Sequence, residues 1–354
     1  MKKYTWLFTL VLAFALIISA CGSPAPTEEA TEVANPATAA PTAAPVVTEA
    51  PVATPFRVAV ILPSAKNDMA FSQSMYDALA AIQTEMGGPD KFEFVFSEGM
   101  FVVDDAAAAV RDYATQGYNL VIAHGSQYGS SLQEIAPDFP NTSFAWGTTV
   151  DTFGQPNIFA YEAASQEGGY VNGVLAATLS TSKVIGIVAP IETGDAKLYV
   201  EGFKDGVASV NPEVKVNVNY IGSFSDVALA AEAATTHISN GADVLTGTAQ
   251  MVVGAIGKAQ ENNVLWFASD ANQSSLAPSI VVASQVYHWE VILKEMIDLI
   301  QAGTLGGQSF TINLANNGEV VEYNPDYALP ADAKALADET VKGIIDGTIT
   351  IALP

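Results

Sequence analysis

Acidic and aromatic side chains follow the first segment that is typical of a buried strand. Residues 56–62 (FRVAVIL) are short, apolar and partly β-branched. Asp68 and Phe71 come next, at the end of a polar loop and at the start of a helical pattern. Ligands of open α/β sheets bind beyond the carboxyl ends of strands. We therefore predict that Asp68 and Phe71 form one wall of a ligand cleft, although Asp68 could instead cap the helix and Phe71 could pack in the core.

A second polar loop follows the apolar segment 119–123. It contains Ser126, Gln127 and Tyr128. A glutamine amide both donates and accepts hydrogen bonds, which suits the edge of a heteroaromatic ring, and a tyrosine ring can stack on the face of one. We predict that all three contact a ligand, and ordinary loop polarity is the alternative for each.

The second half of the chain offers three further candidates. Asp270 follows the apolar segment 264–268, where a buried carboxylate needs a partner that a ligand N–H or hydroxyl could supply. Gln250 stands just before a predicted helix over 252–262. Trp289 is placed to cover a flat ligand, or else to pack in the core.

Several kinds of chemistry lack their motifs in this sequence. There is no Gly-x-Gly-x-x-Gly, no Walker-type Gly-Lys-Ser/Thr, no Gly-x-Ser-x-Gly and no His-Glu-x-x-His. His124, His237 and His288 lack the spacing of metal ligands. The 14 Lys and Arg against 38 Asp and Glu give a net charge of −24, which disfavours a nucleic-acid partner. We predict a binding protein, not an enzyme, with no cofactor and no metal.

Strand-like and helix-like segments alternate along the chain from residue 56 onward, which predicts an α/β fold with parallel sheets. The predicted strands are 56–62, 92–96, 119–123, 142–146, 158–161, 184–188, 214–220, a short one at 244, 264–268, 280–286 and 310–314. The predicted helices are 70–86, 104–116, 130–136, 168–179, 197–210, 227–240, 252–262, 289–302 and 331–346.

The N-terminus has the pattern of a signal peptide. Lys2 and Lys3 precede an apolar stretch too short for a comfortable membrane span, and the stretch ends in Ser19-Ala20-Cys21. This ending resembles the bacterial lipobox, in which the cysteine is lipidated; a plain secretory signal with a chance cysteine is the alternative. Residues 1–21 are thus predicted to be a lipoprotein signal peptide with Cys21 as the anchor. Residues 22–55, rich in Ala, Thr and Pro, are predicted to be a disordered linker.

From residue 56 onward the chain resembles the basic membrane protein family of bacterial lipoproteins, which are substrate-binding components of ABC importers for purine nucleosides or bases. The stretches that carry the resemblance are 68–73 (DMAFSQ), 167–177 (EGGYVNGVLAA), 201–206 (EGFKDG), 220–226 (YIGSFSD), 241–244 (GADV) and 268–270 (ASD).

The resemblance implies a type I periplasmic-binding-protein fold, with two Rossmann-like lobes of parallel sheet joined by a three-strand hinge. We expect residues 56–162 plus 287–354 to form the N-terminal lobe and 163–286 the C-terminal lobe. We place the hinge crossings near Glu162, near Val286 and late in the chain.

Two positions depart from the family pattern. Ser72 stands where many nucleoside-binding members have Asn, and Tyr287 replaces a lysine that faces the ligand in many members, while Ser284 matches the serine before it. The Trp-containing segment Tyr287-His288-Trp289, with Tyr170-Val171 in the crossing helix, resembles the branch that binds a free purine base.

The sequence therefore predicts an extracytoplasmic solute-binding lipoprotein, held on the cell membrane through Cys21. We expect a monomer that captures a purine base or nucleoside by hinge closure and passes it to an ABC permease and ATPase. A sensory lipoprotein reporting to a membrane receptor, a binder of a non-purine solute such as a sugar, and an extracellular enzyme are the alternatives. A transcription regulator is excluded, because the segment before Phe56 is a signal and linker and not a helix-turn-helix.

Overall fold

The computed structural model describes residues 54–353 of the 354-residue chain. The predicted signal peptide, the lipid anchor at Cys21 and nearly all of the predicted linker lie outside the described residues. Every helix within 54–353 is too short or too polar to span a lipid bilayer.

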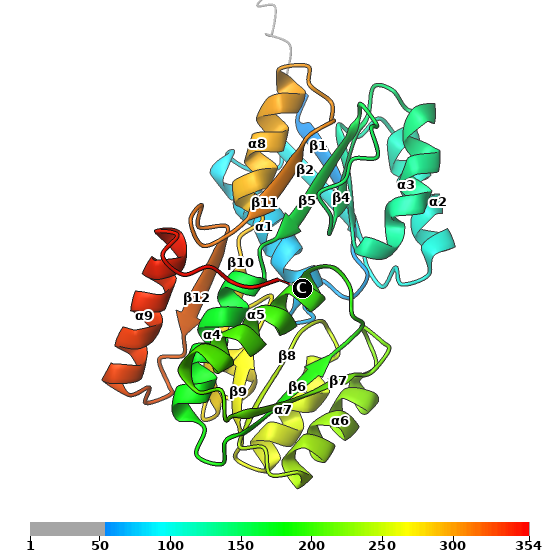
Figure 1. The fold of residues 1–354 in the computed structure, drawn as a ribbon. Coiled ribbons are helices and arrows are strands. Elements are labelled where there is room, and N and C mark those ends of the chain that lie inside the picture. Colours follow the sequence, from blue (N-terminus) through cyan, green and yellow to red (C-terminus); the bar gives the residue numbers. More distant parts are fainter. Residues whose placement is uncertain (1–53, 354) are drawn as a thin grey trace, which may run out of the picture. The chain divides into compact units, whose positions relative to one another are not determined.

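The first sheet has six parallel strands in the order β11-β5-β4-β3-β1-β2 (Figure 1). Five of them come from the first part of the chain, and the edge strand β11 returns from much later. Their bounds are β1 Phe56–Ile61, β2 Phe92–Ser97, β3 Leu120–His124, β4 Ser143–Gly147, β5 Ile158–Ala163 and β11 Ser309–Ile312.

The second sheet also has six strands, in the order β12-β10-β9-β8-β6-β7. All pairs are parallel except β10 with β12, which run antiparallel. Their bounds are β6 Val184–Ala189, β7 Lys215–Tyr220, β8 Val244–Gly247, β9 Leu265–Ala268, β10 Val281–Tyr287 and β12 Glu319–Tyr323.

Helices cover both faces of each sheet, because the strands are apolar on both sides and must be buried on both. On the first sheet, α1 (Phe71–Glu85) and α8 (Glu290–Gln301) pack on one face, and α2 (Val103–Thr115) and α3 (Gly129–Ile135) on the other. On the second sheet, one face carries α4 (Gln166–Leu179), α5 (Gly194–Val210) and α9 (Ala331–Ile345), and the other carries α6 (Val227–Ser239) and α7 (Val252–Glu261). Each sheet with its helices forms one lobe.

Glycines let α4 and α5 approach each other closely. A Cβ placed on Gly169 would lie 2.5 Å from the carbonyl oxygen of Tyr199, and one on Gly206 would lie 2.1 Å from that of Tyr170. Any side chain at these positions would force the two backbones apart. The small residues that the sequence places in the helix after β5 are therefore required by packing, and α5 keeps a fixed position from which it presents its first turn.

The chain passes between the two sheets three times, at residues 164–165, 288–289 and 313–318. This arrangement of two α/β sheets and three crossings confirms the predicted fold class. The last crossing lies within the segment 287–354 that we had assigned whole to the first lobe.

That assignment is wrong for residues 319–345. Strand β12 pairs with β10 of the second sheet, and Ala333 and Ala337 of α9 are buried in the core of the second lobe. Strand β12 was not predicted, because this short edge strand carries a glutamate at its first position and another within it, which does not match an apolar strand pattern.

Candidate ligand-binding site

A cavity between the two lobes encloses about 500 Å³ of space free of protein atoms, part of it open to solvent. Every residue that lines it comes from a segment that follows the carboxyl end of a strand, as expected for an open α/β sheet. The first lobe contributes Pro63, Phe71, Phe101, Gly125, Ser126, Gln127 and Thr148, and the second contributes Thr193, Asp195, Ala196, Phe224, Thr248, Ala249, Gln250 and Asp270.

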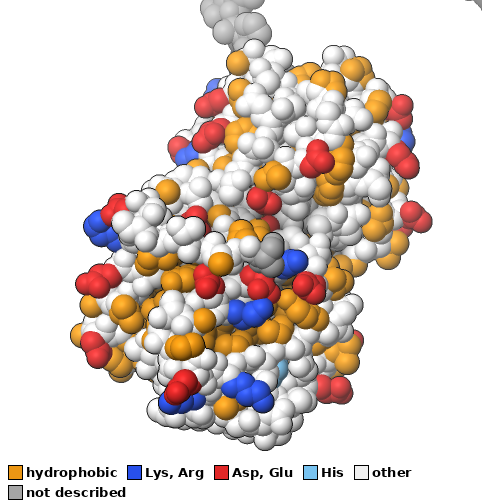
Figure 2. Space-filling view, viewed as in Figure 1, with side chains coloured by type: hydrophobic (Ala, Val, Ile, Leu, Met, Phe, Trp, Pro, Cys, Tyr) orange, Lys and Arg blue, Asp and Glu red, His pale blue; other side chains and the backbone are white. Residues whose placement is uncertain are grey.

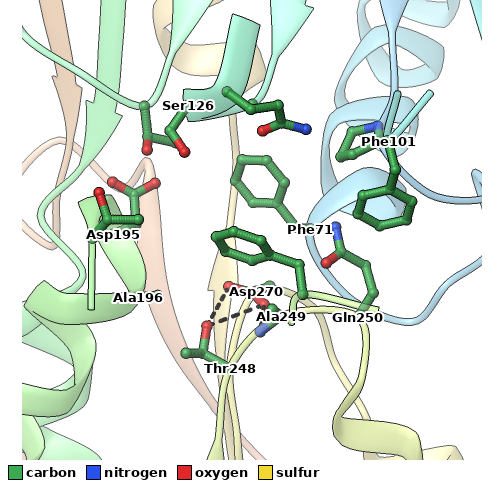
Figure 3. A pocket seen from close by; sticks show the side chains of 15 residues that line it. Phe71, Phe101, Ser126, Asp195, Ala196, Thr248, Ala249, Gln250 and Asp270 are labelled. Carbon is green, nitrogen blue, oxygen red and sulfur yellow. Dashed lines mark hydrogen bonds between the residues drawn. The ribbon is translucent and has the colours of Figure 1, made fainter. Parts of the chain in front are cut away.

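Phe71 lies near the middle of this group, with Ser126 and Asp195 on one side of it and Phe101 and Gln250 on the other (Figure 3). Of the predicted ligand residues, those that line the cavity are Phe71, Ser126, Gln127, Gln250 and Asp270. The tertiary fold thus gathers residues from four separate loops at one cavity.

His124 fixes the ring of Phe71. The two rings stack with centroids 3.8 Å apart and planes 7° apart. The imidazole is buried, and its Nε2–H donates to the Phe71 carbonyl oxygen at 3.0 Å while Nδ1 accepts from the Tyr161 hydroxyl at 2.8 Å. Burial lowers the pKa of His124 to about 3, so the ring is neutral. One face of Phe71 is therefore already covered, and its remaining surface borders the cavity.

Asp68 does not line the cavity, although we predicted it in the cleft wall. Its Oδ1 accepts from the backbone N–H groups of Ala70 and Gln73 at 2.9 and 3.0 Å, and its Oδ2 accepts from that of Ser72 at 3.2 Å. These bonds satisfy otherwise free donors in the first turn of α1. The capping alternative is the one that the geometry supports.

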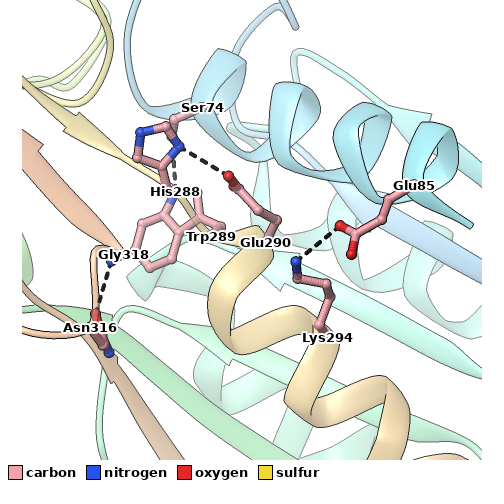
Figure 4. Close-up of polar contacts among 8 residues, drawn as sticks. All are labelled: Ser74, Glu85, His288, Trp289, Glu290, Lys294, Asn316 and Gly318. Atoms are coloured by element: carbon pink, nitrogen blue, oxygen red, sulfur yellow. Dashed lines mark hydrogen bonds and ion pairs between the residues drawn. The ribbon is translucent and has the colours of Figure 1, made fainter.

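Tyr128 and Trp289 also lie away from the cavity. Tyr128 is buried in the core of the first lobe, and its hydroxyl donates to the Met100 carbonyl oxygen at 2.7 Å. Trp289 is fully buried at a hinge crossing, and its indole N–H donates to the hydroxyl of Ser74 at 2.9 Å (Figure 4). Its ring meets Phe71 edge-on with centroids 6.2 Å apart. Trp289 therefore contacts Phe71 without reaching the cavity.

Asp270 is a buried carboxyl at the base of the cavity in Figure 3. Its Oδ2 accepts from the Ala249 backbone N–H at 3.1 Å, and the Thr248 hydroxyl lies 3.5 Å from both oxygens. Burial raises the pKa of Asp270 to about 6, and the nearby Asp68 carboxylate adds to the rise. Ala249 and Asp270 both have left-handed backbones, with φ of 74° and 70°. Such conformations are strained for non-glycine residues and occur often at functional sites.

Asp195 is a site residue that the sequence analysis missed. It lies in the first turn of α5, where an acid is common simply because the helix start favours negative charge. In the structure it is only 7% exposed and lines the cavity, and neither carboxyl oxygen has a hydrogen-bond partner within the described residues. The backbone N–H of Ala163 faces it without meeting hydrogen-bond geometry. Its position after the carboxyl end of β6 could have identified it, because the same kind of position, after β9, was the reason for selecting Asp270.

The cavity is polar and aromatic but not basic. Among its lining residues in 54–353 there is no Lys, Arg or His. Within the same part of the chain, no three His, Cys, Asp or Glu side chains are grouped so as to hold a metal ion. The site thus offers stacking surfaces and hydrogen-bond acceptors but no countercharge for an anion.

Comparison with known proteins agrees with this geometry. A family model described as ABC transporter substrate-binding protein PnrA-like matches residues 56–352. The chain belongs to this family. It is thus an ABC transporter solute-binding protein, a class that binds small molecules and contacts transporter components.

Relatives of this chain include a purine-binding protein of Brucella abortus, 27% identical over 260 residues that span 73% of each chain. An ABC transporter nucleoside-binding protein of Lactococcus lactis is 25% identical over 307 residues, covering 80% of this chain and 85% of its own. A solved ABC transporter solute-binding protein from Conexibacter woesei superposes with a TM-score of 0.68 at 22% identity, covering 84% of this chain and 98% of its own. This last likeness shows the fold.

Proposed function

We propose that this protein captures a purine base or nucleoside between its two lobes and delivers it to an ABC permease driven by an ATPase. The observation that carries this proposal is the lining of the cavity. Phe71 and Phe101 of the first lobe and Phe224 of the second supply aromatic surface from both sides of the cleft. Stacking of a nucleobase on an aromatic side chain contributes about 1–3 kcal/mol per base in nucleic-acid complexes.

The polar groups of the cavity fit an uncharged heterocycle. Asp195 and Asp270 accept from N–H groups, and the amides of Gln127 and Gln250 both donate and accept. A phosphate would meet two buried acids and no basic residue, which is unfavourable. Bases and nucleosides are therefore expected to bind, and nucleotides are expected to be rejected.

A free base fits better than a nucleoside at one position. Tyr287, which stands where many relatives have a ligand-facing lysine, is buried, and its hydroxyl lies 2.6 Å from that of Ser165. The side chain is therefore engaged at the hinge and does not line the cavity. This favours a base as the preferred solute.

Closure of the hinge would complete the site, because its walls come from both lobes. One hydrogen bond already joins the lobes beside the cavity: Gln273 Nε2 of the second lobe donates to the Met69 carbonyl oxygen of the first at 2.9 Å. Gln273 is itself held by the Trp266 indole N–H, which donates to its Oε1 at 3.0 Å. This contact supports a closed state in which α1 and the β9–β10 loop are held together.

Delivery requires a location outside the cytoplasm. We place the protein on the extracytoplasmic face of the cell membrane, held by lipid on Cys21, with residues 22–55 as the tether. Expression of the Cys21→Ser variant tests this placement. Release of the variant from the membrane fraction supports the anchor, and retention identical to that of the unmodified chain overturns it.

A ligand screen tests the solute. The purified protein is heated with nucleobases, nucleosides, nucleotides, sugars and amino acids, and each compound that raises the unfolding temperature is titrated by calorimetry. Ligand at 100 times its Kd is expected to stabilise the fold by about 2.7 kcal/mol. Stabilisation by a sugar or amino acid, with none by any purine, refutes the purine assignment.

Transport is tested separately in cells. Deletion of the gene is expected to reduce uptake of the labelled purine. Normal uptake together with an altered response to the purine would instead indicate a sensory role.

A further inference from the structure

We propose that Asp195 reads the hydrogen-bonding edge of the bound solute, pairing through its two carboxyl oxygens with an adjacent donor and acceptor on a heterocyclic ring. This inference rests on the proposed purine-binding function and names the residue that would select the solute. It makes Asp195 a specificity-determining residue for the amide-like or amidine-like edge of a purine.

The first argument is the absence of partners for a deeply buried acid. Buried polar groups are nearly always hydrogen-bonded, yet both oxygens of Asp195 lack a partner within residues 54–353. The hydroxyls of Thr148 and Thr193 line the same cavity but donate no hydrogen bond to it. Asp270, by contrast, accepts from the Ala249 N–H. Of the two cavity carboxyls, Asp195 therefore has the greater hydrogen-bonding capacity left for a solute.

The second argument is the direction in which the carboxyl points. Figure 3 shows Asp195 facing the space around Phe71, on the side opposite Phe101 and Gln250. A ring stacked on Phe71 would present its edge toward this wall of the cavity. Two oxygens on one carboxyl match two neighbouring polar atoms on a flat ring, as in other bidentate contacts.

The third argument concerns the protonation of Asp195. Burial raises its pKa well above the usual range, and the negative charges of Glu162 and Asp270 add to the rise. The titratable groups that face it are all acids or phenols: Glu162, Asp270, Tyr161, Tyr287 and Glu319. Burial thus shifts Asp195 toward its neutral form, which offers one O–H donor beside one C=O acceptor. That pair complements an N–H next to a ring nitrogen or carbonyl.

An ordinary role at the helix start explains these observations less well. An acid that serves the dipole of α5 would be stabilised in its charged form, and its pKa would fall. The pKa of Asp195 rises instead.

The test compares Asp195→Asn with Asp195→Leu by calorimetric titration with guanine, hypoxanthine and adenine. Asparagine keeps a donor beside an acceptor, so it is expected to bind within about threefold of the unmodified protein at mildly acidic pH. Leucine cannot pair and is expected to weaken binding about 10- to 100-fold. Glu201→Gln is the matched control, because Glu201 lies on the same helix but is paired with Lys204 and does not line the cavity.

The pH profile separates recognition from packing. The unmodified protein should lose affinity as rising pH ionises Asp195, whereas Asp195→Asn should keep its affinity over the same range. If Asp195→Leu fails to fold, the comparison of the two pH profiles, of the unmodified protein and of Asp195→Asn, is enough to test the role of Asp195. Affinity of the Leu variant equal to that of the unmodified protein, a loss in the Asn variant as deep as in the Leu variant, or identical pH profiles would each overturn the assignment. Failure of the unmodified protein to bind any purine would instead refute the proposed function, and this assignment with it.

Discussion

Replacement of Asp270 by Asn should stabilise the unliganded protein while weakening solute binding. The carboxyl is 2% exposed, and among residues 54–353 it accepts from the Ala249 N–H at 3.1 Å and, at the longer distance of 3.5 Å, from the Thr248 hydroxyl. A buried charge with so few partners is costly, and asparagine removes the charge while its amide oxygen can still accept from Ala249. The position would then trade stability for function, as binding sites often do.

The pKa of Asp270 sets the magnitude. A rise from 3.8 to about 6 corresponds to about 3 kcal/mol, at about 1.4 kcal/mol per pH unit. The unfolded chain releases this proton near pH 3.8 and the folded protein near pH 6. Unfolding therefore becomes easier as pH rises between these values, and above them the folded state is less stable by up to about 3 kcal/mol. Asp270→Asn should match the unmodified protein at acidic pH and exceed its stability by up to that amount at neutral pH.

Urea unfolding at acidic and at neutral pH measures this difference. Other buried acids also titrate, but subtracting the unmodified protein from the variant isolates Asp270. Asp298→Asn, a change of the same kind at an exposed site on α8, is the control and should alter stability by less than about 0.5 kcal/mol at either pH. An Asp270→Asn variant whose stability difference is the same at both pH values would refute the reasoning.

Three other substitutions separate binding from stability. Phe71→Leu should weaken purine binding about 5- to 150-fold by calorimetry, since one stacking face is lost, whereas Phe310→Leu, a control on the far edge strand β11, should not change it. Trp289→Phe should lower the free energy of unfolding, measured in urea, by about 1–3 kcal/mol, because the indole hydrogen bond to Ser74 is lost. If this variant lost as much affinity for the purine as Phe71→Leu does, the placement of Trp289 outside the cavity would be contradicted. Burial raises the pKa of Asp243, but hydrogen bonds from residues 180–182 outweigh it and lower that pKa to about 2. Asp243→Asn should therefore lower the free energy of unfolding by about 1 kcal/mol at neutral pH, a figure reduced for solvent screening at this half-buried site. This difference from the unmodified protein should fade as pH falls from about 4 to about 2, and a difference that does not change with pH would count against this account.

The alternation of apolar and amphipathic segments predicted most elements of the fold, because strands buried on both faces leave a strong local signal. Segment 92–96 became β2 and segment 289–302 became α8, each within two residues at either end. Strand β12 could not be predicted in this way. Glu319, its first residue, is fully buried, and its carboxylate accepts from Gln285 Nε2 at 2.8 Å and from the Gly168 N–H. Those partners are far away in the sequence, so the local pattern suggested a polar loop.

The candidate site could be predicted in part. The rule that ligands meet the carboxyl ends of strands selected Phe71 and Asp270, and both line the cavity. The same rule selected Tyr128, which the fold turns into the core. Trp289 was predicted to cover a flat ligand from beside the hinge, and its side chain is buried in the core of the first lobe instead. Sequence position gives the loop on which a side chain lies but not the direction in which it points.

The sequence by itself determined that this chain builds two α/β lobes with a binding cleft at the strand ends, and that its motifs are those of a solute-binding family. Hydrophobic periodicity and short motifs are local properties of the chain, so they can be recognised in a single sequence without its structure. Only the tertiary structure decided that His124 stacks on Phe71, and that Asp195 faces the cavity without a hydrogen-bond partner among residues 54–353. Each of these facts depends on how loops from different strands meet, and burial and hydrogen bonding are fixed only when they do.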